Sequence, residues 1–349
     1  MINAKESVEG SAPAPRILNI GGGAPNITSL IGRHVSKLTG YAPALPTPFN
    51  IEGNIDVPAF EHLCDLQLAH GATALIVCGT TGEAPTLTSE EHRLLIRIAA
   101  AQTHGRIPVI AGAGANATAH AIELSRDAEA AGADAVLSVV PYYNKPMQAG
   151  LYAHFRSIAE STGLPIILYD VPARTACCLS DHTVARLAEL PRIIGLKDAA
   201  GDATRPARLR PLVGTNFRLL CGEDTLALPY MAQGGDGCIS VTSNVAPGLC
   251  RSMYLAWKRG QSVRARRLER PIAELTAVLF RETNPVPLKQ ALASLGLMTP
   301  AVRLPLVRLS EPHRIELSEV LFRLCHEHAE QMIGSTEAAP VNRRLAVGQ

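Results

Sequence analysis

The sequence is short of the features that mark membrane, secreted and metal-binding proteins. No stretch approaches the roughly 18 to 20 apolar residues that a membrane-spanning helix needs. The first residues, MINAKESVEGSAPAPR, lack the basic start and apolar middle of a secretory signal. The eight cysteines show no C-x-x-C spacing, which argues against a zinc site or a disulfide framework. We therefore expect a cytoplasmic protein with no metal and no membrane partner.

Excess charge of one sign is also missing. Lys and Arg total 33 against 31 Asp and Glu, and the one basic cluster, RARRLER at 264–270, is typical of a solvated helix face. This balance argues against nucleic acid as a partner. The 349 residues are 47% hydrophobic, which is enough apolar material for one large domain or two.

Lysine is scarce. Only six of the 33 basic residues are lysines, and they lie at positions 5, 37, 145, 197, 258 and 289. Any chemistry that requires a primary amine therefore has few candidates. Arginine cannot replace them, because it stays protonated and forms no imine.

Short apolar runs followed by turn residues recur about every 30 residues from Leu38 onward. They are YAPALPTPF, TALIVCGTTGE, IPVIAGAGANAT, DAVLSVVPYYN, PIILYDVPART, RIIGLKDAAGD, FRLLCGED and DGCISVTSN. Stretches such as SEEHRLLIRIAAAQTH between them have apolar residues at helical spacing. Eight alternating strands and helices predict an α/β protein with a parallel (β/α)8 TIM barrel. The alternative, an open doubly wound sheet, is disfavoured because no glycine-rich turn follows the first strand.

The chain outside the barrel divides into three further parts. Residues 1–36 are rich in Gly, Ala, Pro and Ser, and we expect a flexible N-terminal extension there. The barrel is expected at 37–246. After Pro247 the strand pattern stops, and four helical stretches separated by Pro or Gly predict a helical domain at 247–333. Residues 334–349 read as a tail.

The barrel interpretation puts the active site at the carboxyl ends of the strands, where polar residues gather. Lys197 ends the sixth predicted strand, whereas Lys145 lies in a loop and the other lysines lie in the extension or in outer helices. An amine attacks a carbonyl only when neutral, and burial disfavours its charged form. We therefore predict Schiff-base catalysis by Lys197 on a keto substrate. A lysine paired at the strand end with Asp198 or Asp202 is the structural alternative.

Seven motifs follow one another along the chain: CGTTGEAPTLTSEEH, IPVIAGAGANAT, PYYNKPMQAGLYAHF, LYDVPART, GLKDAAGD, GGDGCISVTSNVAP and NPVPLKQAL. In this order they resemble the signatures of the dihydrodipicolinate synthase and N-acetylneuraminate lyase superfamily of class I aldolases. The resemblance runs from about Leu38 to about Leu324.

The resemblance implies a lyase that needs no cofactor, because Lys197 itself forms the imine with pyruvate. It assigns a proton relay to Tyr169, Thr80 and Tyr143, with Tyr143 donated by a partner in a homodimer or homotetramer. It further implies that Thr81 holds the pyruvate carboxylate and that Gly222 and Ile239 shape the pocket.

The second substrate is inferred from Arg174. In this superfamily an arginine in the V-P-x-R-T string implies contact with the carboxylate of L-aspartate 4-semialdehyde, and so the first committed step of lysine and diaminopimelate biosynthesis. Sugar-acid and sialic acid lyases usually lack that arginine. Two departures are Asp170, where Asn is common, and Ala176, where Gly is common. Asp170 would weaken binding of an anionic aldehyde if it faced the pocket.

The superfamily also has a lysine-feedback site, and the resemblance assigns it to a set of six positions. These positions are Ala84, Ser89, His92, Asn116, His120 and Tyr142. Because His120 replaces an acidic residue, we expect weak inhibition by lysine or none. Two alternative functions stay open: a paralogous lyase for N-acetylneuraminate or 2-keto-3-deoxy sugar acids, and a non-catalytic protein that binds keto acids.

Overall fold

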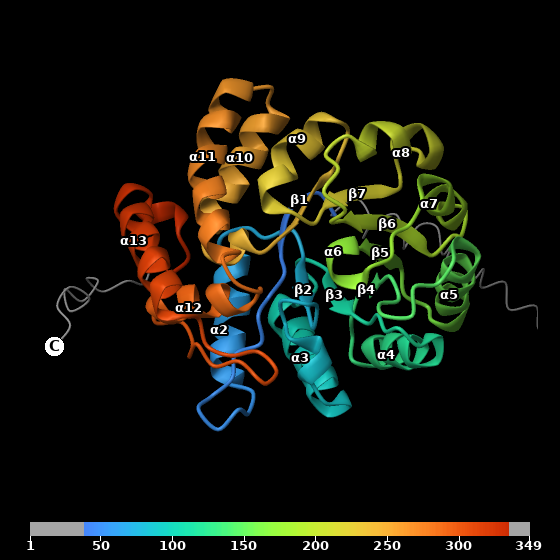
Figure 1. The fold of residues 1–349 in the computed structure, drawn as a ribbon, viewed down its shortest axis with the longest axis horizontal. Coiled ribbons are helices and arrows are strands. Elements are labelled where there is room, and N and C mark those ends of the chain that lie inside the picture. The colour runs from blue at the N-terminus through green and yellow to red at the C-terminus, as the bar shows by residue number, and fades with distance from the viewer. Residues whose placement is uncertain (1–37, 335–349) are drawn as a thin grey trace, which may run out of the picture.

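The computed structural model describes residues 38–334, which form a closed barrel of eight parallel strands surrounded by helices (Figure 1). The strands are β1 (Gly40–Pro43), β2 (Leu75–Val77), β3 (Val109–Gly112), β4 (Ala135–Val139), β5 (Ile166–Asp170), β6 (Ile193–Asp198), β7 (Arg218–Cys221) and β8 (Gly237–Ser240). The extension at 1–36, almost all of the tail, and Lys5 and Lys37 lie outside the described residues.

The strand order confirms the predicted TIM barrel. Each strand pairs in parallel with its sequence neighbour from β2 to β8, and β8 pairs with β1. The ring closes between β1 and β2 through a bridge from Ala44 to Ile76, with Leu45 N donating to Ile76 O at 2.9 Å. The carboxyl ends of all eight strands therefore open on one face.

The helices cover the outside of the barrel or form an appendage beside it. They are α2 (Val57–Ala69), α3 (Ser89–Thr103), α4 (Thr118–Ala130), α5 (Gln148–Ser161), α6 (Pro172–Thr175), α7 (Asp181–Ala188), α8 (Arg205–Val213), α9 (Ala227–Ala232), α10 (Pro247–Lys258), α11 (Ser262–Leu279), α12 (Val286–Ser294) and α13 (Glu311–Glu327). Short 3-10 turns η1 (Ala84–Thr86), η2 (Asp224–Leu226), η3 (Thr242–Asn244) and η4 (Ala329–Gln331) complete the described chain.

Local signals explain where some of these helices begin. Thr88 and Glu91 form a capping box at the start of α3, in which Glu91 N donates to Thr88 Oγ1 and Thr88 N donates to Glu91 Oε2. One boundary differs from the sequence prediction. The sequence predicts that Pro or Gly separates the helices after Pro247, but α11 runs without a break from Ser262 to Leu279 and contains both RARRLER and Pro271. Proline thus does not separate two helices at this point.

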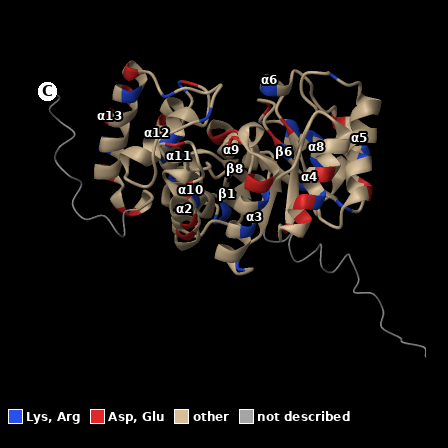
Figure 2. Cartoon of the chain, turned by 90° about the horizontal axis from the view of Figure 1, so that it is seen from below, with Lys and Arg blue, Asp and Glu red and all other residues tan. Residues whose placement is uncertain are grey.

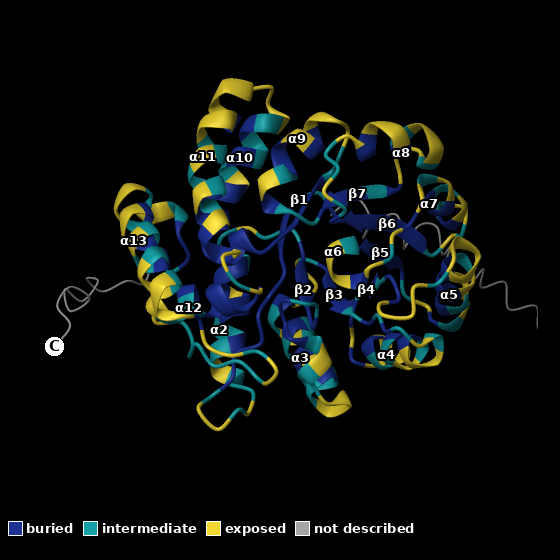
Figure 3. Cartoon of the chain, viewed as in Figure 1, coloured by how far each residue is buried: buried dark blue, intermediate teal, exposed yellow. Residues whose placement is uncertain are grey.

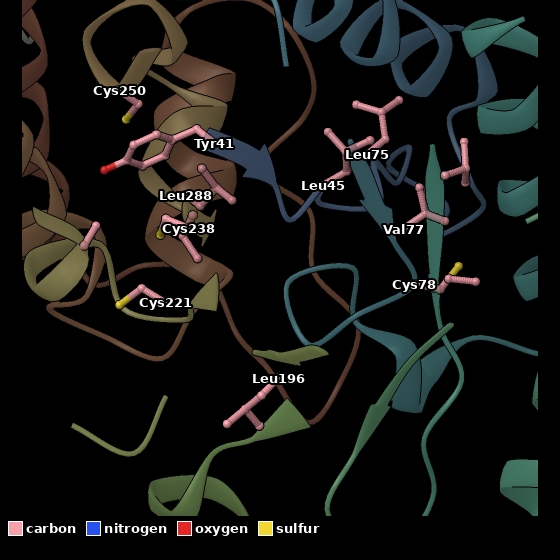
Figure 4. Packing of buried hydrophobic residues seen from close by; sticks show 14 of the residues in the cluster. Tyr41, Leu45, Leu75, Val77, Cys78, Leu196, Cys221, Cys238, Cys250 and Leu288 are labelled. Carbon is pink, nitrogen blue, oxygen red and sulfur yellow. The ribbon is translucent and has the colours of Figure 1, made fainter. Parts of the chain in front are cut away.

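Alternating side chains divide the hydrophobic core into two layers. On β5, Ile167 and Tyr169 belong to the cluster inside the barrel, whereas Ile166 and Leu168 belong to the larger cluster between strands and helices. Figure 3 shows the buried strands enclosed by helices with exposed outer faces. Part of the outer cluster appears in Figure 4, where Tyr41 lies among the buried cysteines Cys221, Cys238 and Cys250.

A register shift determines which side chains of β6 face the barrel interior. Ile166 pairs with Ile193, but Ile167 pairs with Gly195, so β6 carries one extra residue at this point. After the shift, Tyr169 stands opposite Lys197. Leu196 packs in the outer cluster, so Lys197 faces inward.

The helical appendage consists of α11, α12 and α13, which pack on one another at one side of the barrel (Figure 1). Helix α10, the first after the expected boundary at residue 246, packs against β1 as part of the helical ring. Among the described helices, none combines the length and apolar character that crossing a membrane requires.

Candidate active site

Lys197 lies at the carboxyl end of β6 inside the barrel. Its side chain is only 7% exposed, and its Nζ is 4.2 Å from the centroid of the Tyr169 ring. Tyr169 is 8% exposed and is held opposite Lys197 by the β5–β6 ladder. The structure therefore brings together the amine and one of the phenols that sequence reasoning selected.

Gly222, at the end of β7, provides space for the lysine. A Cβ atom added at Gly222 would lie 3.2 Å from Lys197 Cε and 2.9 Å from Ala199 Cβ. The glycine cannot easily withdraw, because its N–H donates to Asp198 O at 2.7 Å. Ile239 on the next strand, β8, is 1% exposed and belongs to the inner cluster.

Thr80 and Thr81 lie in the tight turn that follows β2. Thr81 is 3% exposed, and its Oγ1 accepts a hydrogen bond of 2.9 Å from Asn284 Nδ2. Thr47 Oγ1 donates to Gly82 O at 2.7 Å and fixes the other side of the turn. Hydroxyl groups and backbone amides of this kind suit a small carboxylate.

Arg174 lies in α6, the short helix after β5, and its side chain is exposed. Its Nη2 donates to Asn284 O at 3.3 Å. Asn284 therefore contacts Arg174 through its carbonyl oxygen and Thr81 through its side chain. Ala176, at the end of α6, has a left-handed φ of 54°, which is the conformation that favours the usual glycine.

Asp170 does not face the pocket. The residue is fully buried on the helix side of β5, where its Oδ2 accepts hydrogen bonds from Arg205 Nη1 at 2.9 Å and Leu179 N at 3.1 Å. Arg205 Nη1 also donates to Asp198 Oδ1 at 3.1 Å. Burial raises the pKa of the Asp170 carboxyl, and the nearby Arg205 opposes that shift. The predicted repulsion of an anionic aldehyde by Asp170 therefore has no structural basis.

Arg205 joins the two strands that carry the inward-facing pair. Asp170 and Asp198, which it binds, directly follow Tyr169 and Lys197 and stand opposite each other in the ladder. Figure 2 shows charged segments of both signs beside one another around β6 and α8. The ion pairs lie on the helix side of the two strands and reinforce the register there.

Tyr143 lies in the loop between β4 and α5 and is 86% exposed in the single chain. Its φ of 77° is unusual for a bulky residue that is not glycine. Its neighbour Tyr142 is 38% exposed. The relay of Tyr169, Thr80 and Tyr143 thus draws on three separate segments and stays a prediction.

The six positions expected for lysine feedback come from neighbouring segments above β2, β3 and β4. His92 is buried, with Nε2 2.8 Å from Gly112 O, and burial lowers its pKa. Asn116 O accepts from Asn144 Nδ2 at 3.0 Å, which joins this region to the tyrosine loop. His120 is exposed and lies 3.5 Å from Glu123 Oε2. Ala84 lies in η1, and Ser89 is exposed at the start of α3.

Sequence reasoning missed Lys289 as a buried amine. It was placed on an outer helix, but it is 0% exposed and pairs with Glu83 beside the turn after β2. The motif NPVPLKQAL, which contains both Asn284 and Lys289, was the available signal. Among the lysines between residues 38 and 334, Lys197 is therefore one of two that are buried, and it is the one beneath the open face of the barrel.

Comparison with known proteins agrees with this geometry. The family model described as the dihydrodipicolinate synthetase family matches residues 37–323. The 4-hydroxy-tetrahydrodipicolinate synthase of Thiobacillus denitrificans is 50% identical over 276 residues, which are 79% of this chain and 93% of that protein.

Solved structures are similar over the same range. Dihydrodipicolinate synthase from Aquifex aeolicus has a TM-score of 0.81 and 41% identity, covering 85% of this chain and 100% of that one. The enzyme from Acinetobacter baumannii, solved in complex with pyruvate, has a TM-score of 0.80 and 42% identity, covering 82% of this chain and 98% of that one. The sequence motifs, the barrel and these similarities together show that the chain belongs to the dihydrodipicolinate synthetase family.

Proposed function

We propose that this chain condenses pyruvate with L-aspartate 4-semialdehyde to give 4-hydroxy-tetrahydrodipicolinate. The observation that carries the proposal is the buried amine of Lys197 beside Tyr169, at the open face of the barrel. The relatives named 4-hydroxy-tetrahydrodipicolinate synthase support it. This reaction is the first committed step of lysine and diaminopimelate biosynthesis.

In the first half-reaction, neutral Lys197 Nζ attacks C2 of pyruvate, and loss of water from the carbinolamine gives the imine. Removal of a proton from C3 then gives the nucleophilic enamine. Each step moves a proton, which a phenol beside the amine can accept and return. We assign this relay to Tyr169, Thr80 and Tyr143, and we assign the pyruvate carboxylate to Thr81.

In the second half-reaction, C3 of the enamine attacks the aldehyde carbon, and the aldehyde oxygen takes up a proton as the hydroxyl of the product. The amino group of the bound semialdehyde then attacks C2, closes the ring and releases Lys197. No external electron acceptor is required, because the imine itself serves as the electron sink. We therefore propose that the reaction uses no cofactor.

We assign recognition of the semialdehyde carboxylate to Arg174. Its exposed guanidinium can form charge-assisted hydrogen bonds with a carboxylate. The orientation of Asp170 supports this proposal, because Arg205 holds that carboxylate behind the strand. The pocket therefore receives no negative side chain from the position where the sequence departs from the common asparagine.

The test is borohydride reduction in the presence of pyruvate, followed by mapping of the adduct, and a panel of aldehyde partners. We expect a reduced adduct on Lys197 and turnover with L-aspartate 4-semialdehyde. Turnover with N-acetylmannosamine instead would favour a sialic acid lyase. Failure to form any adduct would favour a protein that only binds keto acids.

We also propose that the chain works as a homodimer or homotetramer, with Tyr143 entering the site of a partner subunit. The 86% exposure and positive φ of this tyrosine support the proposal, because a bulky residue in that conformation needs a compensating role. Analytical ultracentrifugation tests the assembly. Recovery of activity on mixing Tyr143→Phe with Lys197→Ala chains tests the sharing of the site.

A further inference from the structure

A buried ion pair joins α12 to the turn after β2. Nζ of Lys289, which is 0% exposed, pairs with Oε1 of Glu83. It also donates to Ala301 O at 2.8 Å and lies 4.1 Å from the centroid of the Phe49 ring. Burial lowers the pKa of Lys289 to about 8, and Glu83 opposes that shift. Separating the pair would leave a buried charge without compensation, so each partner restrains the other.

The turn that this pair reaches has a strained backbone. Cys78 and Glu83, at its two ends, have φ values of 54° and 55°, in the left-handed region that side chains disfavour. Gly82 packs so closely that an added Cβ would lie 3.1 Å from Cys78 N. Such a backbone persists only where its surroundings hold it in place.

The appendage supplies that restraint at three points. Asn284 Nδ2 donates to Thr81 Oγ1 at 2.9 Å, and Arg303 N donates to Glu83 Oε2 at 3.0 Å. Lys289 binds the other oxygen of the same carboxylate. Both oxygens of Glu83 are therefore held by groups more than 200 positions further along the chain.

We propose that Lys289 is a positioning residue for the reaction: by holding Glu83, it fixes the Thr80–Thr81 turn in the shape that receives the carboxylate of pyruvate. This inference rests on the proposed function of the site. Lys289 itself touches no substrate, because its ammonium is occupied by Glu83 and Ala301. The helical appendage thereby becomes part of the pyruvate site.

The test compares Lys289→Met with the double variant Glu83→Gln, Lys289→Met. The single variant leaves Glu83 charged and buried without its partner, so we expect a lower Tm and at least a tenfold higher KM for pyruvate. The double variant removes the unpaired charge and should regain much of the Tm. It should nevertheless keep the raised KM and form the borohydride-trapped adduct more slowly, because no ammonium holds residue 83.

A matched control is Leu317→Ala, which creates a cavity in α13 of the same appendage without touching the turn. It should lower Tm and leave the KM for pyruvate within about twofold. A wild-type KM in the double variant, or an equal rise in KM in Leu317→Ala, overturns the inference. If Lys289→Met does not fold, the KM for pyruvate of the double variant alone tests the inference. If the unaltered protein forms no adduct with pyruvate, the proposed function fails first and the inference falls with it.

Discussion

Gly222→Ala offers a sharp test of the proposed imine. The new methyl group would stand 3.2 Å from Lys197 Cε and 2.9 Å from Ala199 Cβ, inside the usual 3.5 to 4.0 Å contact distance between carbon atoms. The backbone conformation of Gly222 accepts alanine, since its φ lies outside the left-handed region. The perturbation is therefore purely one of space beside the reacting amine.

The part of the cost that arises from Lys197 falls on the covalent intermediate. Overpacking of this kind costs about 1 to 3 kcal/mol. The contacts with Ala199 Cβ and Asp198 O, at 2.9 and 3.2 Å, are the same in the free enzyme and in the imine. The contact with Lys197 differs, because the flexible lysine can move aside in the free enzyme, whereas in the imine its Cε is fixed by the bound substrate. If about 1 kcal/mol of that energy is specific to the imine, we expect its formation to slow by roughly fivefold.

Borohydride trapping followed by mass spectrometry measures the rate of adduct formation, and thermal unfolding measures stability. Gly150→Ala serves as the control, because its new Cβ meets only Pro146 Cβ at 3.4 Å on the exposed side of α5. The control should trap pyruvate at the wild-type rate. Wild-type trapping by Gly222→Ala would refute the view that Lys197 reacts in the conformation seen here.

Three further predictions concern the aldehyde, acid stability and feedback. Arg174→Ala should raise the KM for L-aspartate 4-semialdehyde about 10- to 100-fold, because a hydrogen bond to a charged group is lost. Steady-state kinetics should show a nearly unchanged KM for pyruvate. Burial lowers the pKa of His154 from 6.5 to about 4, so its contribution to stability is complete above pH 6.5 and is lost as the pH falls toward 4. Between pH 6.5 and pH 4, the free energy of unfolding measured by thermal unfolding should fall less in His154→Gln than in the wild type, by up to ~3 kcal/mol. Equal falls in the two proteins would contradict this. Lysine titration should give little inhibition, whereas strong inhibition at sub-millimolar lysine would refute the role assigned to His120.

The barrel could be predicted because its signals are local and repeat eight times. Each strand is a short apolar run closed by turn residues, and α3 carries its own capping box at Thr88 and Glu91. The orientation of Asp170 was also within reach of the sequence. Neighbours on a strand face opposite sides, so placing Tyr169 inside the barrel puts Asp170 outside.

The partners of the turn after β2 could not be found in the same way. Lys289 lies on a helix 206 positions beyond Glu83, and no periodic pattern relates two such residues. Proline was also an unreliable sign of a helix end. Pro271 lies inside α11, where the tertiary packing of Ile272 and Leu275 retains the helix around it. The family motif NPVPLKQAL marked its region as important without indicating what it touches.

The extra residue in β6 determines whether each later side chain of that strand faces the barrel interior or the helices. If Ile194 were kept but the pairing ran regularly from Ile193 onward, Lys197 would stand opposite Asp170 and face the helices, and Asp198 would face the barrel interior. Pyruvate would then meet a carboxylate, and the amine would lie among the charges around Arg205. A related chain could therefore keep the whole GLKDAAGD motif and still lose the reaction if the extra residue stayed and the bulge did not form, so the pairing of this strand needs to be checked together with its lysine.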